Sequence, residues 1–240
     1  MIRFLVSVLV FVINTLYRDR PYQRFYVLET VARVPYFSFL SVLHLYETMG
    51  WWRKADWLKI HFAESWNELH HLLIMESLGG NQHWSDRALA RTTALIYYWV
   101  VVALYIVSPR TAYNFMEMVE EHAYHTYATF LQEHEAELKA QPAPQVAIHY
   151  YRDGDLYLFD EFQTGVVPES RRPVVDNLYD VFVNIRDDED QHVKTMIACQ
   201  KTDAQNTFQS PHSLPYTEQE VLLPQVSDAE VEHELATAKS

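Results

Sequence analysis

Two short stretches of the chain pair a glutamate with a histidine three residues later. "NELHH" contains Glu68 and His71, and "EDQH" contains Glu189 and His192. On an α-helix three residues turn the chain by roughly 300°, so the two side chains of a pair lie on one face, about 60° apart. A carboxylate and an imidazole in this arrangement can bind one metal ion together.

The residues around each pair decide which pairs are candidates, because the spacing alone is common on solvated helix faces. A third pair, Glu230 and His233 in "EVEHE", lies in a polar tail, and we predict that it faces solvent. The first two pairs lie among apolar residues: Trp66, Leu69, Leu72 and Leu73 for one, and Phe182, Val183, Ile185 and Val193 for the other.

Two further segments each offer a single glutamate in apolar surroundings. Glu29 lies between "FYVL" and "TVARVPYF", and Glu120 lies between "NFMEMV" and "EHAYHTY". A buried carboxylate is costly unless it is paired or bound to a metal, and two single glutamates plus two Glu-x-x-His pairs form the di-iron carboxylate site of four-helix bundles. Four carboxylates balance two divalent ions, and two imidazoles favour iron over magnesium. We therefore predict two iron ions bound by Glu29, Glu68, His71, Glu120, Glu189 and His192.

A purely structural role is the alternative for each acid taken singly. Glu29 could pair with Arg24 or Arg33, and Glu120, which Glu121 follows, could belong to an exposed acidic face. The run "DDED" could likewise be a solvated face, which would apply to Asp187, Asp188 and Asp190.

Composition favours one large domain with tails. Of the 240 residues 49% are hydrophobic, enough for a sizeable core, while only five glycines argue against an all-β fold with many tight turns. The net charge of −13 argues against nucleic acid as the main partner. Residues 1–60 nevertheless hold eight Lys/Arg against four Asp/Glu, and such a basic, aromatic front suits an anionic membrane surface. Cys199 is the only cysteine, which excludes an intramolecular disulfide and a cysteine metal cluster.

Two apolar segments predict contact with a membrane. The chain opens with "MIRFLVSVLVFVINTLY", which we interpret as a membrane-surface helix; a signal peptide is the alternative, but no small-residue cleavage site follows it. No stretch reaches the roughly 18–20 uninterrupted apolar residues of a transmembrane span, and Ala94–Val107 comes nearest. We therefore expect a monotopic protein that lies on one membrane face.

The expected fold is all-α, a ferritin-like four-helix bundle plus membrane-associated helices. Candidate helices cover 22–49 with a bend at Pro35, Asp56–Leu78 with "GGN" as its stop, Ser85–Val107, Thr111–Ala140 and Asp176–Gln200. Residues 141–175 lack a helical period, and we predict a non-helical excursion with a short hairpin at "DGD". The predicted organisation is a membrane-associated segment at 1–20, a helical di-iron domain at 21–200 and a polar tail at 201–240.

Five stretches resemble the alternative oxidase family, and they are closer to its plastid terminal oxidase branch than to its mitochondrial branch. They are "LETVARVPYF", "WNELHHLLIMESLGG", "MVEEHAYHTY", "AIHYYRDGDLYLFDEFQT" and "NLYDVFVNIRDDEDQHVKTM", and they span roughly residues 20–200. The segment "DGDLYLFDEFQT" before the last helix is typical of the plastid branch.

The resemblance implies roles for particular residues. The six acids and histidines above fall on the family's iron ligands, with Glu68 and Glu189 as the bridging pair. Tyr127 would lie beside the irons and take part in electron transfer, because oxygen reduction needs four electrons and two irons hold too few. Further positions tied to quinol binding or activity would be Arg24, Leu28, Thr126, His44, Tyr105 and Asp188, the last of which would support a histidine.

The implied activity is that of a plastoquinol oxidase, which passes electrons from quinol to O₂ and yields quinone and water without pumping protons. The family acts as a homodimer on one leaflet. Plant members carry a transit peptide, whereas this chain starts almost at the bundle. We therefore expect a thylakoid or cytoplasmic membrane of a photosynthetic organism, a cyanobacterium, or a trimmed mature form. The alternatives are a di-iron hydroxylase of a quinone or lipid and a non-catalytic membrane-surface helical protein.

Overall fold

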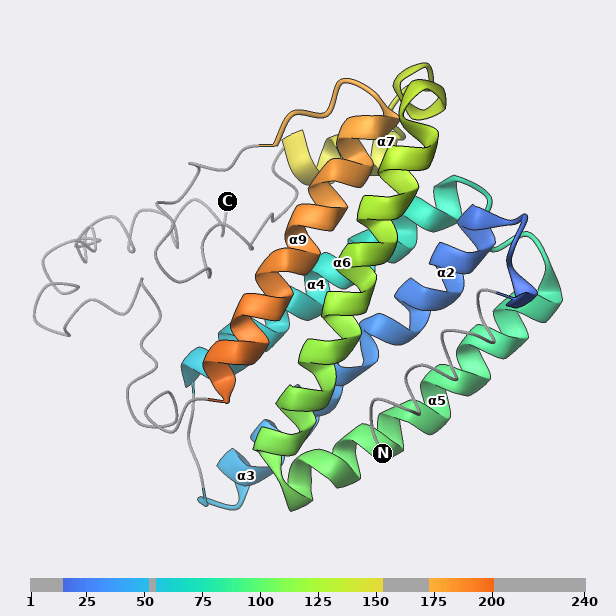
Figure 1. Ribbon diagram of the computed structural model, residues 1–240. Coiled ribbons are helices and arrows are strands. Elements are labelled where there is room, and N and C mark those ends of the chain that lie inside the picture. The colour runs from blue at the N-terminus through green and yellow to red at the C-terminus, as the bar shows by residue number, and fades with distance from the viewer. Residues whose placement is uncertain (1–14, 52–54, 153–172, 201–240) are drawn as a thin grey trace, which may run out of the picture.

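Six helices of more than ten residues make up most of the computed structural model, which describes residues 15–51, 55–152 and 173–200 (Figure 1). The prediction of an all-α fold is confirmed, and no strand occurs in these ranges. The helices are α2 (Pro21–Ala32), α3 (Val34–Thr48), α4 (Ala55–Ser77), α5 (Trp84–Val107), α6 (Pro109–Lys139) and α9 (Leu178–Cys199).

A proline causes the break between α2 and α3. Pro35 stands in the first turn of α3, and the chain leaves the helix at Arg33. Proline has no N–H to donate, and its ring clashes with the carbonyl four residues earlier, so a continuous helix over this segment is unfavourable. The predicted bend is confirmed, and the helices on both sides of it pack on α4 and α5.

Two glycines end α4 and bring it against α2. Gly79 has a φ of 82°, in the left-handed region that glycine adopts without strain at a helix end. Gly80 lies so close to α2 that a Cβ there would be 2.6 Å from the carbonyl oxygen of Tyr22. The sequence "GGN" therefore both stops α4 and permits its close approach to α2.

Side-chain caps fix the starts of the two helices that pack together most extensively, α6 and α9. Ser108 accepts a hydrogen bond from the backbone N–H of Thr111, and Asn177 accepts one from Asp180. Helix α2 packs on α4, α3 packs on both α4 and α5, and α5 lies across α2 and α3 at the edge of the bundle (Figure 1).

The segment after α6 differs from the prediction of a non-helical excursion. Residues 145–152 form two short helical turns, α7 (Gln145–Ala147) and the π-helical turn η1 (Ile148–Arg152). Tyr150 accepts a hydrogen bond from Asn67, and Tyr151 donates one to Asp188, so contacts with α4 and α9 stabilise this segment. The predicted hairpin at "DGD", the tail at 201–240 and most of the opening segment lie outside the described residues.

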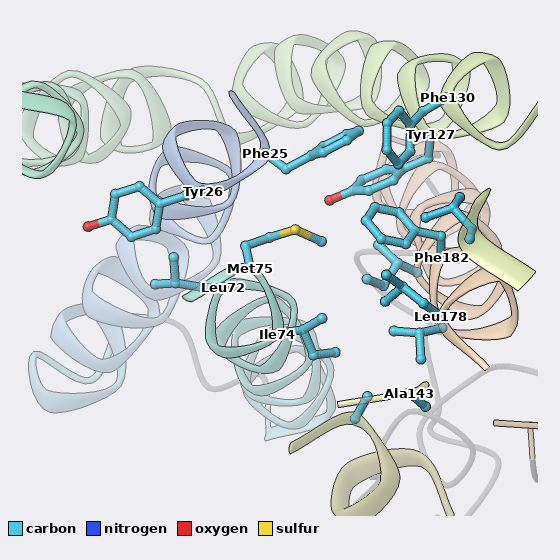
Figure 2. Close-up of a cluster of buried hydrophobic side chains, with 14 of the residues drawn as sticks. Phe25, Tyr26, Leu72, Ile74, Met75, Tyr127, Phe130, Ala143, Leu178 and Phe182 are labelled. Atoms are coloured by element: carbon cyan, nitrogen blue, oxygen red, sulfur yellow. The ribbon is translucent and has the colours of Figure 1, made fainter. Parts of the chain in front are cut away.

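Two clusters of buried apolar side chains form the core. The first contains Phe25, Tyr127, Phe130 and Phe182, and Figure 2 shows these rings gathered between helices. Phe25 and Tyr127 stack with their ring centres 4.5 Å apart. The second cluster surrounds Tyr36 and also contains Phe39, Tyr105 and Tyr113.

Helix α5 exposes an apolar stripe. Leu95, Ile96, Trp99 and Val100 are all more than half exposed, and Val107 at the end of the helix is 83% exposed. Within the described ranges, α5 is the one helix long and apolar enough to cross a membrane, with 24 residues and a mean hydropathy of 1.6 over its most apolar stretch. An exposed stripe of this kind marks an interaction surface.

Candidate metal centre

Four helices bring the six predicted ligands together inside the bundle. One group joins Glu29, Glu68, His71 and Glu189, and a second joins Glu68, Glu120, Glu189 and His192. In each group the candidate ligand atoms lie within 4.8 Å of one another, and all the residues are buried. Two of the glutamates belong to both groups, which is the arrangement expected for two metal ions bridged by shared carboxylates.

Several carboxylate oxygens of this cluster lack the hydrogen-bond donors that buried anions need. Among the described residues no hydrogen bond reaches Glu29 Oε2, Glu68 Oε2 or Glu120 Oε2, and each of these atoms is shielded from solvent. Negative charges this close repel one another strongly in a protein interior. Cations between them would remove the repulsion and supply the missing partners, so the donor set fits a pair of divalent metal ions.

Helix α9 divides the acidic run "DDED" between its two sides. Asp188 and Glu189 are buried, whereas Asp187 and Asp190 lie toward the surface, where Asp190 binds Lys194 at 2.5 Å. The solvated-face alternative therefore holds for Asp187 and Asp190 and is wrong for Asp188. An α-helix makes this division because consecutive residues point about 100° apart.

Glu29 and Glu120 each belong to one ligand group only, and we call them the outer glutamates. Two tyrosines bind them in a reciprocal pattern. Tyr127 on α6 donates a hydrogen bond to Oε1 of Glu29 on α2, and Tyr36 on α3 donates one to Oε1 of Glu120 on α6, at 2.5 Å. Each tyrosine follows the glutamate of its own segment by seven residues, which is two helical turns. Each outer carboxylate thus keeps one oxygen bonded to a phenol and the other available to the cluster.

Asp188 holds one of the candidate ligand histidines. Its Oδ2 lies 3.2 Å from Nε2 of His71 and also accepts hydrogen bonds from Asn67 and Tyr151, at 2.8 Å each. The second nitrogen of His71 faces the cluster, 3.2 Å from Oε1 of Glu189. A carboxylate behind a ligand histidine fixes the tautomer and orientation of its imidazole. Asp188 therefore supports His71 on α4, and not His192, which is on its own helix.

Burial and mutual repulsion favour protons on two of the glutamates when no metal is bound. Loss of hydration on burial raises the pKa of Glu29 and of Glu120 well above the usual range, and repulsion from the shared carboxylates raises it further. Burial alone would lower the pKa of His71, but hydrogen bonds to Asp188 and Glu189 outweigh this and raise it. Metal ions must displace these protons when they bind.

A cleft of about 630 Å³ lies between the start of α2 and the second half of α6. Arg24 and Thr126, both predicted to line a quinol pocket, are among the residues that surround it. Thr126 is followed directly by Tyr127, whose hydroxyl reaches the metal cluster. Neighbouring residues of α6 therefore contact the cleft and the candidate metal site. The cleft has the volume of a typical small-molecule pocket.

Three other predicted residues lie elsewhere. Leu28 is half-buried and packs on the first core cluster without lining the cleft. His44 is exposed on α3. Tyr105 is fully buried in the second core cluster, where its hydroxyl lies 2.7 Å from that of Tyr113. The structure therefore does not bring these residues together with Arg24 and Thr126.

Several site residues were absent from the sequence prediction. Tyr36 binds a candidate ligand directly, and Asn67 and Tyr151 bind Asp188. For Tyr36 a signal existed, because it follows Glu29 by the same seven residues that separate Tyr127 from Glu120. Asn67 and Tyr151 carry no comparable spacing signal.

The fold and the cluster together define a helical-bundle protein with a two-metal carboxylate centre, in which two shared glutamates lie between two histidines. Comparison with known proteins gives the family. A family model described as Alternative oxidase matches residues 1–201, and the chain belongs to this family.

The relatives differ in how much of the chain they match. The protein named Ubiquinol oxidase 4, chloroplastic/chromoplastic, from Arabidopsis thaliana is 63% identical over 211 residues, which cover 88% of this chain and 59% of that protein. Ubiquinol oxidase 2, mitochondrial, from Glycine max and Ubiquinol oxidase 1a, mitochondrial, from Oryza sativa subsp. japonica are each 33% identical over 127 residues, or 52% of this chain and 38% of theirs. The chain thus spans less than two thirds of the length of these relatives. The greater identity to the chloroplastic protein supports the plastid terminal oxidase branch.

Proposed function

We propose that this chain is a quinol oxidase that transfers electrons from plastoquinol to O₂ and yields quinone and water without pumping protons. The observation that carries the proposal is the pair of overlapping ligand groups that share Glu68 and Glu189. Membership of the alternative oxidase family supports the same reaction class.

In this proposal two iron ions occupy the cluster and supply the capacity to take electrons from quinol and pass them to O₂. The groups around Glu29 and Glu120 would each hold one iron, with one histidine apiece. Tyr127 would lie at hydrogen-bond distance from an iron ligand, where a phenol can lose an electron together with a proton. Asp188 would keep the imidazole of His71 oriented toward the metal.

The quinol would bind in the cleft beside Arg24 and Thr126. Both side chains are half-buried, so a ring in the cleft could receive hydrogen bonds from them while its apolar tail remains in lipid. The relatives are named for ubiquinol, whereas the resemblance to the plastid branch favours plastoquinol. The rates with plastoquinol and with ubiquinol should therefore be compared directly.

The exposed stripe of α5 would rest in one leaflet, with the protein as a monotopic homodimer. Trp99, which is 64% exposed, is of the residue type that favours the boundary between lipid and water. The name of the chloroplastic relative supports a plastid membrane, thylakoid included. The comparisons give no support to the expectation of a cyanobacterial source.

Oxygen consumption by the purified protein in detergent tests the proposal. The iron-loaded protein should consume O₂ with plastoquinol, faster than with ubiquinol, and cyanide should inhibit poorly because neither haem nor copper is required. Glu68→Ala and His192→Ala should lose bound iron and oxygen uptake together. Full activity in either variant would contradict the metal assignment.

A di-iron hydroxylase of a quinone or lipid is the second candidate, because its bundle and ligands would look much the same. Isotopically labelled O₂ separates the two reactions. An oxidase delivers all of the label to water, whereas a hydroxylase places part of it in the organic product. A non-catalytic protein would contain essentially no iron, so metal analysis distinguishes this third reading.

A further inference from the structure

Helix α4 carries another buried acid–histidine pair that belongs to neither ligand group. His61 and Glu64 are three residues apart, and Nδ1 of His61 lies 2.8 Å from Oε2 of Glu64. Both side chains are almost completely buried. A buried ion-forming pair is costly to fold, and nothing in the proposed reaction so far uses it.

Two tyrosines extend this pair into a hydrogen-bonded chain. Nε2 of His61 lies 2.8 Å from the hydroxyl of Tyr113 on α6, and that hydroxyl lies 2.7 Å from the hydroxyl of Tyr105 on α5. All four side chains are at most 1% exposed. The result is an unbroken series of three short links, Tyr105–Tyr113–His61–Glu64, across three helices.

Two arrangements of protons satisfy every link. In one, Tyr105 donates to Tyr113, Tyr113 donates to His61, and His61 donates from Nδ1 to an ionised Glu64. In the other, a protonated Glu64 donates to Nδ1 of His61, Nε2 of His61 donates to Tyr113, and Tyr113 donates to Tyr105. Moving one proton along each link converts the first arrangement into the second, which is what proton conduction along a chain requires.

The inner end of the chain faces the metal cluster. Glu64 stands one helical turn before Glu68 on α4. The ring of Tyr36, the tyrosine that binds Glu120, lies between the chain and the cluster: its centre is 6.4 Å from the ring centre of His61 and 5.2 Å from that of the candidate ligand His192. Among the described residues no hydrogen bond occupies the other carboxylate oxygen of Glu64, Oε1.

The outer end lies where α5 meets α6. Tyr105 is itself fully buried, but the next residue, Ile106, is 46% exposed and its backbone carbonyl accepts a surface hydrogen bond from the hydroxyl of Tyr46, so the outer end of the chain lies close to the surface. This junction lies at the start of α6, whereas residues between 122 and 134 of α6 line the cleft beside Arg24. Protons taken up here would therefore reach the cluster by a route separate from the quinol cleft.

We propose that Tyr105, Tyr113, His61 and Glu64 form a proton relay that carries protons from the α5–α6 junction to the metal cluster during oxygen reduction. The proposal rests on the proposed function, in which reduction of one O₂ to two waters consumes four protons. In each passage Tyr105 takes a proton from a hydronium ion and gives its own to Tyr113, Tyr113 gives one to Nε2 of His61, and Nδ1 gives one to Glu64. Glu64 then releases one proton to the cluster, where oxygen reduction consumes it. No electron moves along the chain, and the hydroxyls and imidazole return to the first arrangement before the next passage.

Four variants interrupt the relay while they preserve size. Tyr105→Phe and Tyr113→Phe each remove one hydroxyl. His61→Gln keeps a donor and an acceptor but cannot pass a proton between them, and Glu64→Gln can accept a hydrogen bond from His61 but not its proton. Tyr98→Phe on α5 is the matched control, because it removes a hydroxyl that hydrogen-bonds to the surface residue Ser41, away from the relay.

The assay is quinol-dependent O₂ uptake by the full iron-loaded chain in H₂O and in D₂O, together with iron content and melting temperature. The relay variants should keep two irons and the wild-type quinol KM, while kcat falls about tenfold or more and the solvent isotope effect increases. Tyr98→Phe should match wild type in all these quantities. A purely structural role predicts instead that His61→Gln, which keeps both hydrogen bonds, restores wild-type kcat.

Wild-type kcat in an iron-replete His61→Gln or Glu64→Gln protein would overturn the relay. Loss of iron from all four variants would also overturn it, because the chain would then be a support of the site. Failure of the proposed function has a different signature: the wild-type protein would bind iron yet show no quinol-dependent O₂ uptake.

Discussion

Tyr127 on α6 donates its hydroxyl hydrogen to Glu29 on α2, across a separation of 98 residues in the chain. Tyr36 returns the same contact, from the α2–α3 segment to Glu120 on α6. The two outer glutamates are therefore held by equivalent phenols from opposite sides. The two tyrosines make equivalent hydrogen bonds, but only Tyr127 lies next to Thr126, which lines the cleft. A comparison of the two can therefore distinguish a role in electron transfer from a role in positioning a ligand.

Substitution of each tyrosine by phenylalanine should distinguish chemistry from positioning. Tyr127→Phe should keep two irons and lose most turnover, because in the proposed mechanism this phenol exchanges an electron with the irons. Tyr36→Phe should lower iron affinity about tenfold, as expected for loss of a bond to a ligand, yet retain turnover once it is loaded. Iron titration and single-turnover oxygen reduction measure the two effects. Wild-type rates for Tyr127→Phe would make this tyrosine an ordinary core residue.

Asp188→Asn should weaken metal binding about 10–100-fold, because His71 loses the carboxylate that orients its imidazole. Asp190→Asn is the matched control from the same acidic run, because Asp190 lies toward the surface, where it binds the side chains of Lys194 and Gln191 and no candidate ligand. Iron retention during dialysis against a chelator compares the two variants. Equal retention would show that Asp188 does not support the ligand.

Iron affinity should fall as the pH is lowered from about 8 to about 6, and iron binding should release protons. The sign follows from the metal-free cluster, in which the pKa values of Glu29, Glu120 and His71 are raised, so that these groups hold protons that iron must displace. Calorimetric titration in buffers of different ionisation enthalpy measures the number of protons released. An affinity that is independent of pH over this range would contradict the protonated cluster.

Gly80→Ala should destabilise the protein by ~1–3 kcal/mol, because the added methyl group meets backbone oxygens of Tyr22 and Met75 at 2.6 and 2.8 Å. The clash would separate α4 from α2 and hence Glu68 from Glu29, so bound iron should fall as well. Gly50→Ala is the control, since its left-handed φ of 69° costs about 1 kcal/mol but the site has open space. Thermal melts and iron analysis separate local strain from displacement of the site.

A double substitution on α5, Ile96→Glu with Trp99→Glu, should weaken binding to vesicles while iron content is unchanged. Both side chains are more than 60% exposed and lie within the apolar stripe, so carboxylates there would have to enter lipid. Co-sedimentation with vesicles of plastid lipid composition measures the effect. Undiminished sedimentation would mean that another surface contacts the membrane.

The sequence alone determined the helices and the identity of the six candidate ligands. Glu68 with His71 and Glu189 with His192 are local patterns, because a spacing of three residues fixes two side chains on one helix face whatever the rest of the chain does. The break near Pro35 and the stop at Gly79 are local for the same reason, since each follows from the backbone of one residue. The turns at 145–152 were missed because contacts with α4 and α9 stabilise them.

Only the tertiary structure decided which side chains meet across helices. Tyr36 reaches Glu120 over 84 positions, and His61 reaches Tyr113 over 52, distances at which no periodicity links one residue to the other. Such contacts depend on how far each helix extends and how it is rotated against its neighbours, which packing of the whole core sets. The ligand types could therefore be read along the chain, whereas the hydrogen bonds that join Tyr36 and Tyr127 to glutamates of other helices, and the buried chain from Tyr105 to Glu64, could not.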